Sequence, residues 1–192
     1  MFGIGGVVVV AAIAGVIVGI ALKGRWRDNG FMRTAEGQLI HWRPSESLTI
    51  WYRSDLSAEY VRALGAATRL LNGIVGRDLF SEIVPAPKTF RFDMNPPAGA
   101  GMIAICDDNG DDPTHGSTEL ADDAGVIQWA KMTLPENARS DQIPGIVLHE
   151  LCHALGLDHD ESVQSIMYYR LQDRPQELSQ ADRDLLRGYY AA

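Results

Sequence analysis

Residues 149–160 decide the fold of this chain, and they read His-Glu-Leu-Cys-His-Ala-Leu-Gly-Leu-Asp-His-Asp. His149 and His153 are four residues apart, so on an α-helix their imidazoles lie on one face, one turn apart. Two such nitrogens can share a zinc ion at about 2.0–2.1 Å. Glu150 lies roughly 100° further round the helix, close to the metal but poorly placed to be a third ligand. We therefore expect Glu150 to be the general base for a zinc-activated water.

The third ligand is expected to follow the helix. A continuing helix cannot supply it, because residue 157 would lie too far along the axis. Gly156 is the expected helix stop, since glycine readily adopts the left-handed cap conformation, and His159 then returns to the metal. Three protein ligands leave one position open for water, as in a catalytic zinc site. The alternative is three solvent-facing histidines, but the five fixed positions match by chance in only on the order of 10⁻⁵ of such sequences.

The stretch resembles the zinc-binding consensus of the metzincin metallopeptidases, and of their matrixin-like members in particular. Residues 165–169, Ser-Ile-Met-Tyr-Tyr, are similar to the metzincin Met-turn, in which Met167 would form an apolar floor beneath the ligands. The resemblance is tight over residues 149–169 and loose over residues 48–190. It implies an α+β zincin domain with a twisted mixed sheet of about four to five strands, a long active-site helix and a C-terminal helix. It also implies a zinc metalloendopeptidase acting on proteins or peptides.

The subfamily features are mixed. Residues 178–189 resemble the closing helix of matrixins, whereas Asp160, directly after the third histidine, is usual in adamalysins. Met167 followed by Tyr169 resembles astacins and serralysins, where this tyrosine can approach the zinc and stabilise an oxyanion. The resemblance implies that role for Tyr169, with a packing role as the alternative.

The segment before the active-site helix carries three further expectations. His115 is alone there, so the second, structural zinc of matrixins is not expected. In metzincins the edge strand in this region pairs with the substrate main chain, which maps to residues 115–121. An acidic loop could bind Ca²⁺, a hard ion that takes oxygen ligands, or be a solvated turn. The residues of this loop are Asp107, Asp108, Asn109, Asp111 and Asp112.

Two features remain near the motif. The loop of residues 168–175 is expected to help shape the S1′ pocket. Cys152 points away from the ligand face, and a small buried residue packing on the sheet is the favoured interpretation. A disulfide between Cys106 and Cys152 is expected only if the domain faces an oxidising space.

Three helices follow from capping signals. Ser57 favours a helix from Ala58 to about Asn72, with Gly73 as its stop. The active-site helix is expected to begin at Asp141 as N-cap and to end at Gly156. Ser179 is expected to cap a last short helix.

Strands are expected where β-branched and aromatic residues gather between turn signals. The strongest are residues 48–53 and 125–134, and the others are residues 38–42, 89–93, 101–106 and 114–121.

The first 22 residues contain no Asp, Glu, Lys, Arg or His. As a helix this run would span roughly 31 Å, the thickness of a bilayer core, so we expect a transmembrane helix at residues 1–22, with a cleaved signal peptide as the rival. A juxtamembrane linker at residues 23–47 and a metallopeptidase domain at residues 48–192 would follow. Gly15 and Gly19 form a G-x-x-x-G that can allow close packing in a homodimer, although a helix without a specific dimer is the favoured interpretation.

The orientation in that single-pass arrangement stays open. The positive-inside rule favours the inner side for the domain, whereas metzincins usually work outside. The basic residues after the span are Lys23, Arg25, Arg27 and Arg33.

Composition narrows the function further. The chain has 192 residues, a formal net charge of −8 and two cysteines. The acidic balance argues against nucleic-acid binding, and two cysteines cannot form a disulfide framework. The second hypothesis is a non-catalytic, metal-stabilised, membrane-anchored assembly protein, as in a virion, but the retained Glu150 disfavours it.

Overall fold

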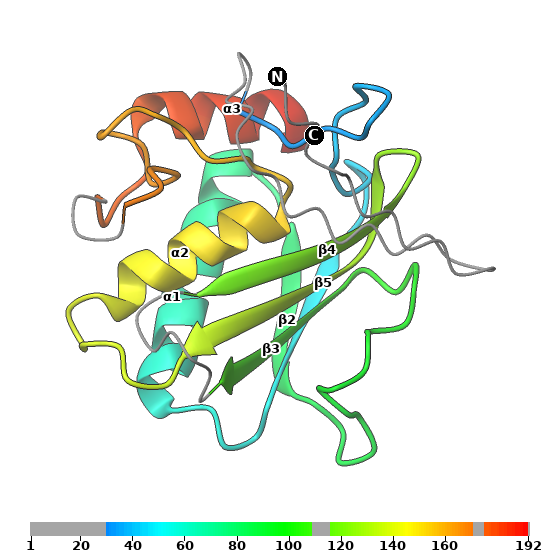
Figure 1. Cartoon of the computed structure of the whole chain (residues 1–192), viewed down its shortest axis with the longest axis vertical. Coiled ribbons are helices and arrows are strands. Elements are labelled where there is room, and N and C mark those ends of the chain that lie inside the picture. The colour runs from blue at the N-terminus through cyan, green and yellow to red at the C-terminus, as the bar shows by residue number, and fades with distance from the viewer. Residues whose placement is uncertain (1–29, 109–115, 171–174, 192) are drawn as a thin grey trace, which may run out of the picture.

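The computed structural model describes residues 30–108, 116–170 and 175–191, and Figure 1 shows the chain. A five-stranded sheet and three helices make up this part. In chain order they are β1 (Leu48–Tyr52), α1 (Ala58–Val75), β2 (Phe80–Pro85), β3 (Met102–Asp108), β4 (Ser117–Asp123), β5 (Val126–Pro135), α2 (Ile143–Ala154) and α3 (Gln180–Tyr190).

The sheet is mixed, with the strand order β2-β1-β3-β5-β4. The four strands β2, β1, β3 and β5 run parallel, and β4 closes one edge antiparallel to β5. α2 packs against β4, β5 and α1, and α1 also contacts α3. The α+β zincin architecture expected from the sequence is thus present, with the helix that carries the histidines beside the edge strand.

The helix α1 begins as expected but ends later. Ser57 accepts a hydrogen bond from Tyr60 N at its start. Gly73 does not stop the helix, because Ile74 and Val75 behind it are buried and continue the apolar face. The left-handed residue that ends the helix is Gly76, with φ of 74°.

The strand expected at residues 89–93 is wrong, because that stretch forms turns. Phe90 packs edge-on against Trp51 and Phe92, so these half-buried aromatic residues cover one another through ring contacts rather than by pairing in a strand. The sequence does not predict the strand β2, because the prolines at and after its end indicate a break in the chain. The Asn72 side chain fixes its start by pairing with both backbone groups of Phe80, at 2.9 Å each.

The beginning of α2 also differs from the expectation. Its N-cap is Gln142, which makes no capping hydrogen bond through its side chain. The carboxylate of Asp141 instead pairs with Arg139, at 2.9 Å and 3.0 Å. The ion pair with Arg139 thus holds the Asp141 carboxylate, which would otherwise be available to accept from a backbone N–H at the start of α2.

Residues 30–47, expected to belong to a linker, pack against the domain. Phe31 and Ile40 are each 3% exposed and Trp42 is fully buried. His41 forms a bridge to Val126 beside the sheet. This stretch therefore contributes to the hydrophobic core.

The membrane helix in the expected fold class and localisation is not supported by the structure. Within residues 30–108, 116–170 and 175–191, no helix is long and apolar enough to cross a bilayer. The longest, α1, carries Glu59, Arg62 and Arg69, while α2 and α3 have only 12 and 11 residues. Residues 1–22, with Gly15 and Gly19, lie outside the described residues.

Candidate metal centre

Helix α2 presents its ligands from a buried position. His149 is 2% exposed, Glu150 3% and His153 9%. Pro144 lies in the first turn of the helix, where its missing N–H costs no hydrogen bond. The histidine spacing therefore places both imidazoles on one side of a helix that is held rigidly in the core.

Backbone carbonyls fix the tautomers of the two helical histidines. His149 Nδ1 donates to Ile166 O at 2.7 Å, and His153 Nδ1 donates to Leu157 O at 2.8 Å. A proton on Nδ1 leaves the lone pair on Nε2, which is the form that binds metal. The hydrogen bonds thus prepare both Nε2 atoms as ligands.

His159 completes a cluster with these two residues. One nitrogen from each of the three imidazoles lies within 4.8 Å of the others, and His153 Nε2 is 3.1 Å from His159 Nε2. Two ligands of a tetrahedral zinc ion, each about 2.05 Å from the metal, lie roughly 3.3 Å apart. The donor set and its spacing therefore fit zinc.

The turn that leads to His159 needs Gly156. Its φ is 93°, and a Cβ at this position would lie only 2.0 Å from Ile40 O. The expected helix stop is therefore in place, and the close approach of the residue-40 backbone adds a second reason for glycine.

Three distant groups satisfy the carbonyls at the end of α2 and of the two residues that follow it. Trp42 Nε1 donates to Ala154 O at 2.8 Å, and the Tyr190 hydroxyl donates to Leu155 O at 2.6 Å. Met32 N donates to Gly156 O at 2.8 Å. These carbonyls have no partner within the helix, so the contacts stabilise the turn that carries the third ligand.

The expected Met-turn lies behind His149. Met167 is 1% exposed. The buried carboxylate of Asp182 accepts from Ser165 Oγ at 2.6 Å and from Ile166 N at 3.1 Å. Because Ile166 O accepts from His149, the carboxylate of Asp182 acts on the metal ligand through a single residue, Ile166.

Glu150 faces the edge strand. Its Oε2 accepts a hydrogen bond from Thr118 Oγ1 at 2.7 Å. A Cβ on Gly116 would lie 2.7 Å from Glu150 Cγ, so only glycine leaves room for the glutamate there.

The comparisons with known proteins agree with this site. The sequence model of the matrixin family matches residues 94–191, just over half of the chain. The chain belongs to the matrixin family. With the three-histidine cluster, membership of this zinc metallopeptidase family assigns a zinc ion to the centre.

One curated relative of this matrixin is "Matrix metalloproteinase-A" from Caenorhabditis elegans. The two are 28% identical over 106 residues, which is 55% of this chain but only 18% of the relative.

Three solved structures are similar in outline. An archaemetzincin from Methanopyrus kandleri has a TM-score of 0.49 at 11% identity, covering 76% of this chain and 96% of its own. High choriolytic enzyme 1, a hatching-enzyme zinc-protease from Oryzias latipes, has a TM-score of 0.37 at 18% identity, covering 73% and 55%. A zinc-dependent peptidase from Methanocorpusculum labreanum has a TM-score of 0.42 at 16% identity, covering 73% and 100%.

Two other expected site residues of this matrixin follow the third histidine in the chain. Asp160 N donates to Met167 O at 3.0 Å, and Asp160 Oδ1 accepts from Ser162 N at 2.7 Å. Asp160 therefore ties the loop after His159 to the Met-turn. Tyr169 is 39% exposed, and the guanidinium of Arg170 lies 5.3 Å from the centre of its ring.

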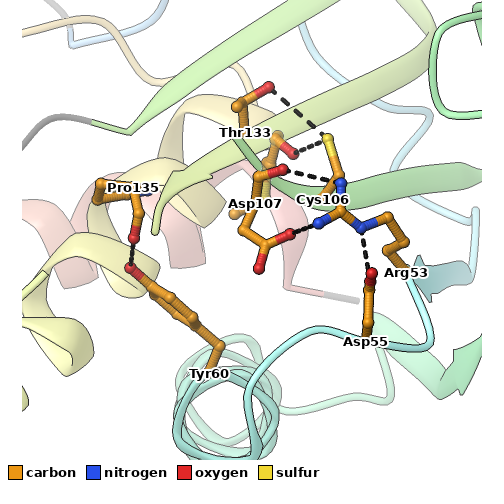
Figure 2. Close-up of polar contacts among 8 residues, drawn as sticks. Arg53, Asp55, Tyr60, Cys106, Asp107, Thr133 and Pro135 are labelled. Carbon is orange, nitrogen blue, oxygen red and sulfur yellow. Dashed lines mark hydrogen bonds and ion pairs between the residues drawn. The ribbon is translucent and has the colours of Figure 1, made fainter. Parts of the chain in front are cut away.

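In this matrixin the first carboxylate of the expected calcium loop, that of Asp107, is paired with the guanidinium of Arg53. Figure 2 shows Arg53 between Asp55 and Asp107, with its Nε 2.6 Å from Asp55 Oδ1 and its NH2 bonded to Asp107 Oδ1. Residues 109–115 lie outside the described residues, so the calcium prediction and His115 stay untested.

Both cysteines of this matrixin are buried free thiols. Burial raises the pKa of each thiol. Cys106 Sγ lies 3.9 Å from Met132 O on the neighbouring strand, and Cys152 is fully buried within α2, as the packing interpretation expects.

Sequence reasoning missed several residues that support the zinc ligands. Thr118, Trp42 and Tyr190 act across long stretches of chain, and no local pattern marks them. Asp182 carried a usable signal, because it stands three residues after Ser179 and completes the capping box of α3.

Proposed function

We propose that this matrixin is a zinc-dependent endopeptidase in which Glu150 is the general base. The observation that carries the proposal is a buried glutamate directly next to a three-histidine cluster whose tautomers suit zinc. Family membership supports the same reaction class.

When bound, Zn²⁺ supplies a Lewis acid that makes water a nucleophile near neutral pH and polarises a peptide carbonyl. His149, His153 and His159 hold the ion. Glu150 accepts the proton of the attacking water at a carboxylate oxygen and delivers it to the nitrogen of the leaving amine.

Strand β4 is the proposed substrate-binding edge. Among the strands that the structure describes, it is the outermost of the sheet and pairs with β5 alone, so its other side can add an extended peptide as a further strand. The side-chain preference of the S1′ pocket stays open, because residues 171–174 of its expected loop lie outside the described residues.

Tyr169 is the proposed oxyanion-stabilising residue, since it follows Met167 by two positions and its side chain is partly exposed. A Tyr169→Phe variant checks this role: kcat should fall while zinc stays bound. An unchanged kcat would leave Tyr169 with a packing role alone.

The decisive experiment replaces Glu150 with glutamine. Glu150→Gln should keep the fold and zinc but lose at least about a hundredfold in cleavage of an unfolded protein such as casein. Glu177→Gln, the same change at an exposed position, is the matched control and should cleave normally. Equal cleavage by wild type and Glu150→Gln would contradict the proposal. A zinc-loaded wild type that cleaves no unstructured substrate would favour the non-catalytic alternative.

A further inference from the structure

Two residues at the beginning of β4 lie against the glutamate of α2, one directly before the strand and one within it. Side chains alternate across a strand, so Gly116, just before β4, and Thr118 share one face. Ser117 and Glu119 on the other face are exposed, whereas Thr118 is half-buried. The inner face at the beginning of β4 therefore lies directly over Glu150.

The Thr118 hydroxyl makes the closer of its two contacts with the carboxylate. Oγ1 lies 2.7 Å from Glu150 Oε2 and 3.2 Å from Glu150 O. A hydroxyl has one proton to donate, and a charged carboxylate oxygen at the shorter distance is the stronger acceptor. The hydroxyl thus restrains one oxygen of a side chain that has several rotatable bonds.

Gly116 limits the same side chain from close by. A methyl group at this position would lie 2.7 Å from Glu150 Cγ and 2.9 Å from Oε1. Both atoms belong to a flexible side chain, so an alanine would displace the glutamate rather than the backbone.

From these contacts we propose that Thr118 is a positioning residue, which together with the space left by Gly116 sets the orientation of the Glu150 carboxylate. A general base is effective only when it lies within hydrogen-bond reach of the proton it removes. The inference rests on the proposed peptidase function, and it adds that the edge strand must hold a hydroxyl group against Glu150. The strand that is proposed to bind the substrate main chain also aims the catalytic glutamate.

The kinetic test compares Thr118→Val with Thr118→Ser. Valine keeps the shape and removes the hydroxyl, so kcat for a peptide that wild type cleaves should fall about 10- to 100-fold, as for other groups that orient active-site residues. KM and zinc affinity should change less than about twofold, because no ligand is touched. Serine keeps the hydroxyl and should restore most of kcat. Thr133→Val, the same change on the neighbouring strand, is the control and should leave kcat unchanged.

Gly116→Ala tests the second contact. It should keep the fold and zinc but lower kcat in the same way as Thr118→Val. An unchanged kcat in Thr118→Val, or a serine variant as slow as valine, would overturn the inference.

A second measurement separates this inference from the proposed function. In the zinc-free protein, Thr118→Val should lower Tm by about 3–8 °C when Glu150 is present and by less than half of that in a Glu150→Ala background. This coupling is measurable even if no substrate is cleaved. Equal shifts in the two backgrounds would overturn the inference while leaving the peptidase proposal intact.

Discussion

The two ends of helix α3 support the zinc site in different ways. At the first turn, the Asp182 carboxylate, 6% exposed, accepts hydrogen bonds from Ser165 and Ile166 of the Met-turn, which in turn holds His149. At the last turn, the fully buried Tyr190 hydroxyl donates to Leu155 O, at the turn that leads to His159. One short helix thus acts on the first and third ligands.

The difference lies in how the support is distributed. At the first turn a single carboxylate accepts every one of these hydrogen bonds, because Asp182 accepts from Ser179 N at 2.8 Å as well as from Ser165 and Ile166. Tyr190 shares its task with Trp42 and with Met32 N, each of which satisfies a separate carbonyl at the end of α2. A single substitution should therefore cost far more at the beginning of α3 than at its end.

The largest effect is expected for Asp182→Ala. Loss of the carboxylate leaves the Ser165 hydroxyl and two backbone N–H groups without their acceptor, and the free energy of unfolding should fall by about 3–4 kcal/mol. Zinc affinity should fall about 10- to 100-fold, because Ile166 O no longer holds His149 in place. Chemical unfolding and competition with a zinc chelator measure the two quantities.

Asp184→Ala is the matched control, because this exposed carboxylate lies in the same helix and pairs only with exposed groups. A stable Asp182→Ala protein with wild-type zinc affinity would show that the Met-turn holds His149 without α3.

These supports mark the boundary between what sequence can predict and what it cannot. The positions of His149, His153 and Gly156 follow from helix periodicity and from one special backbone conformation, which are local properties. The hydrogen bond between Trp42 and Ala154 joins residues 112 positions apart. Nothing near Trp42 in the sequence marks this contact with the end of α2, and the residue lies in the stretch of residues 23–47 that the sequence assigns to a linker.

The same reasoning explains the errors in the secondary structure. A glycine often ends a helix, but at Gly73 the buried Ile74 and Val75 behind it outweigh the local preference. A run with aromatic residues predicts a strand at residues 89–93, but Phe90 packs against the ring of Trp51 instead of pairing in a sheet. In each case a tertiary contact decided against a local signal.

A variant of Tyr60 tests whether the Tyr190 hydroxyl supports zinc binding because of where it lies, or whether any buried tyrosine that donates to a backbone carbonyl would do so. Tyr60 also donates to a backbone carbonyl, that of Pro135 (Figure 2), but it belongs to α1 and not to α3. Burial raises the pKa of Tyr60 to about 12 from an ordinary value of 10. A raised pKa favours the neutral form in the folded state, so this stabilisation is complete below pH 10 and is lost between pH 10 and about 12.

The wild type should therefore lose up to about 2–3 kcal/mol of stability over that range from Tyr60, and Tyr60→Phe should lose correspondingly less. Tyr190, whose pKa burial also raises, loses stability over the same pH range by the same amount in both proteins, so the difference between them reports on Tyr60. Zinc affinity of Tyr60→Phe at neutral pH should equal that of wild type. Weaker zinc binding in this variant would mean that any buried tyrosine contact supports the site.

The smallest effect is expected for Tyr190→Phe. The ring stays in the core, and only the hydroxyl is lost, which accepts from Trp42 N at 3.2 Å and donates to Leu155 O. The free energy of unfolding should fall by about 1–2 kcal/mol. Because Trp42 and Met32 N still hold the neighbouring carbonyls, zinc affinity should fall by less than about tenfold, from a more mobile His159. Tyr189→Phe is the matched control, since its ring contacts with Phe31 and His41 are kept. If Tyr190→Phe weakens zinc binding as much as Asp182→Ala does, the support at the end of α2 is not shared, and the two ends of α3 are equivalent.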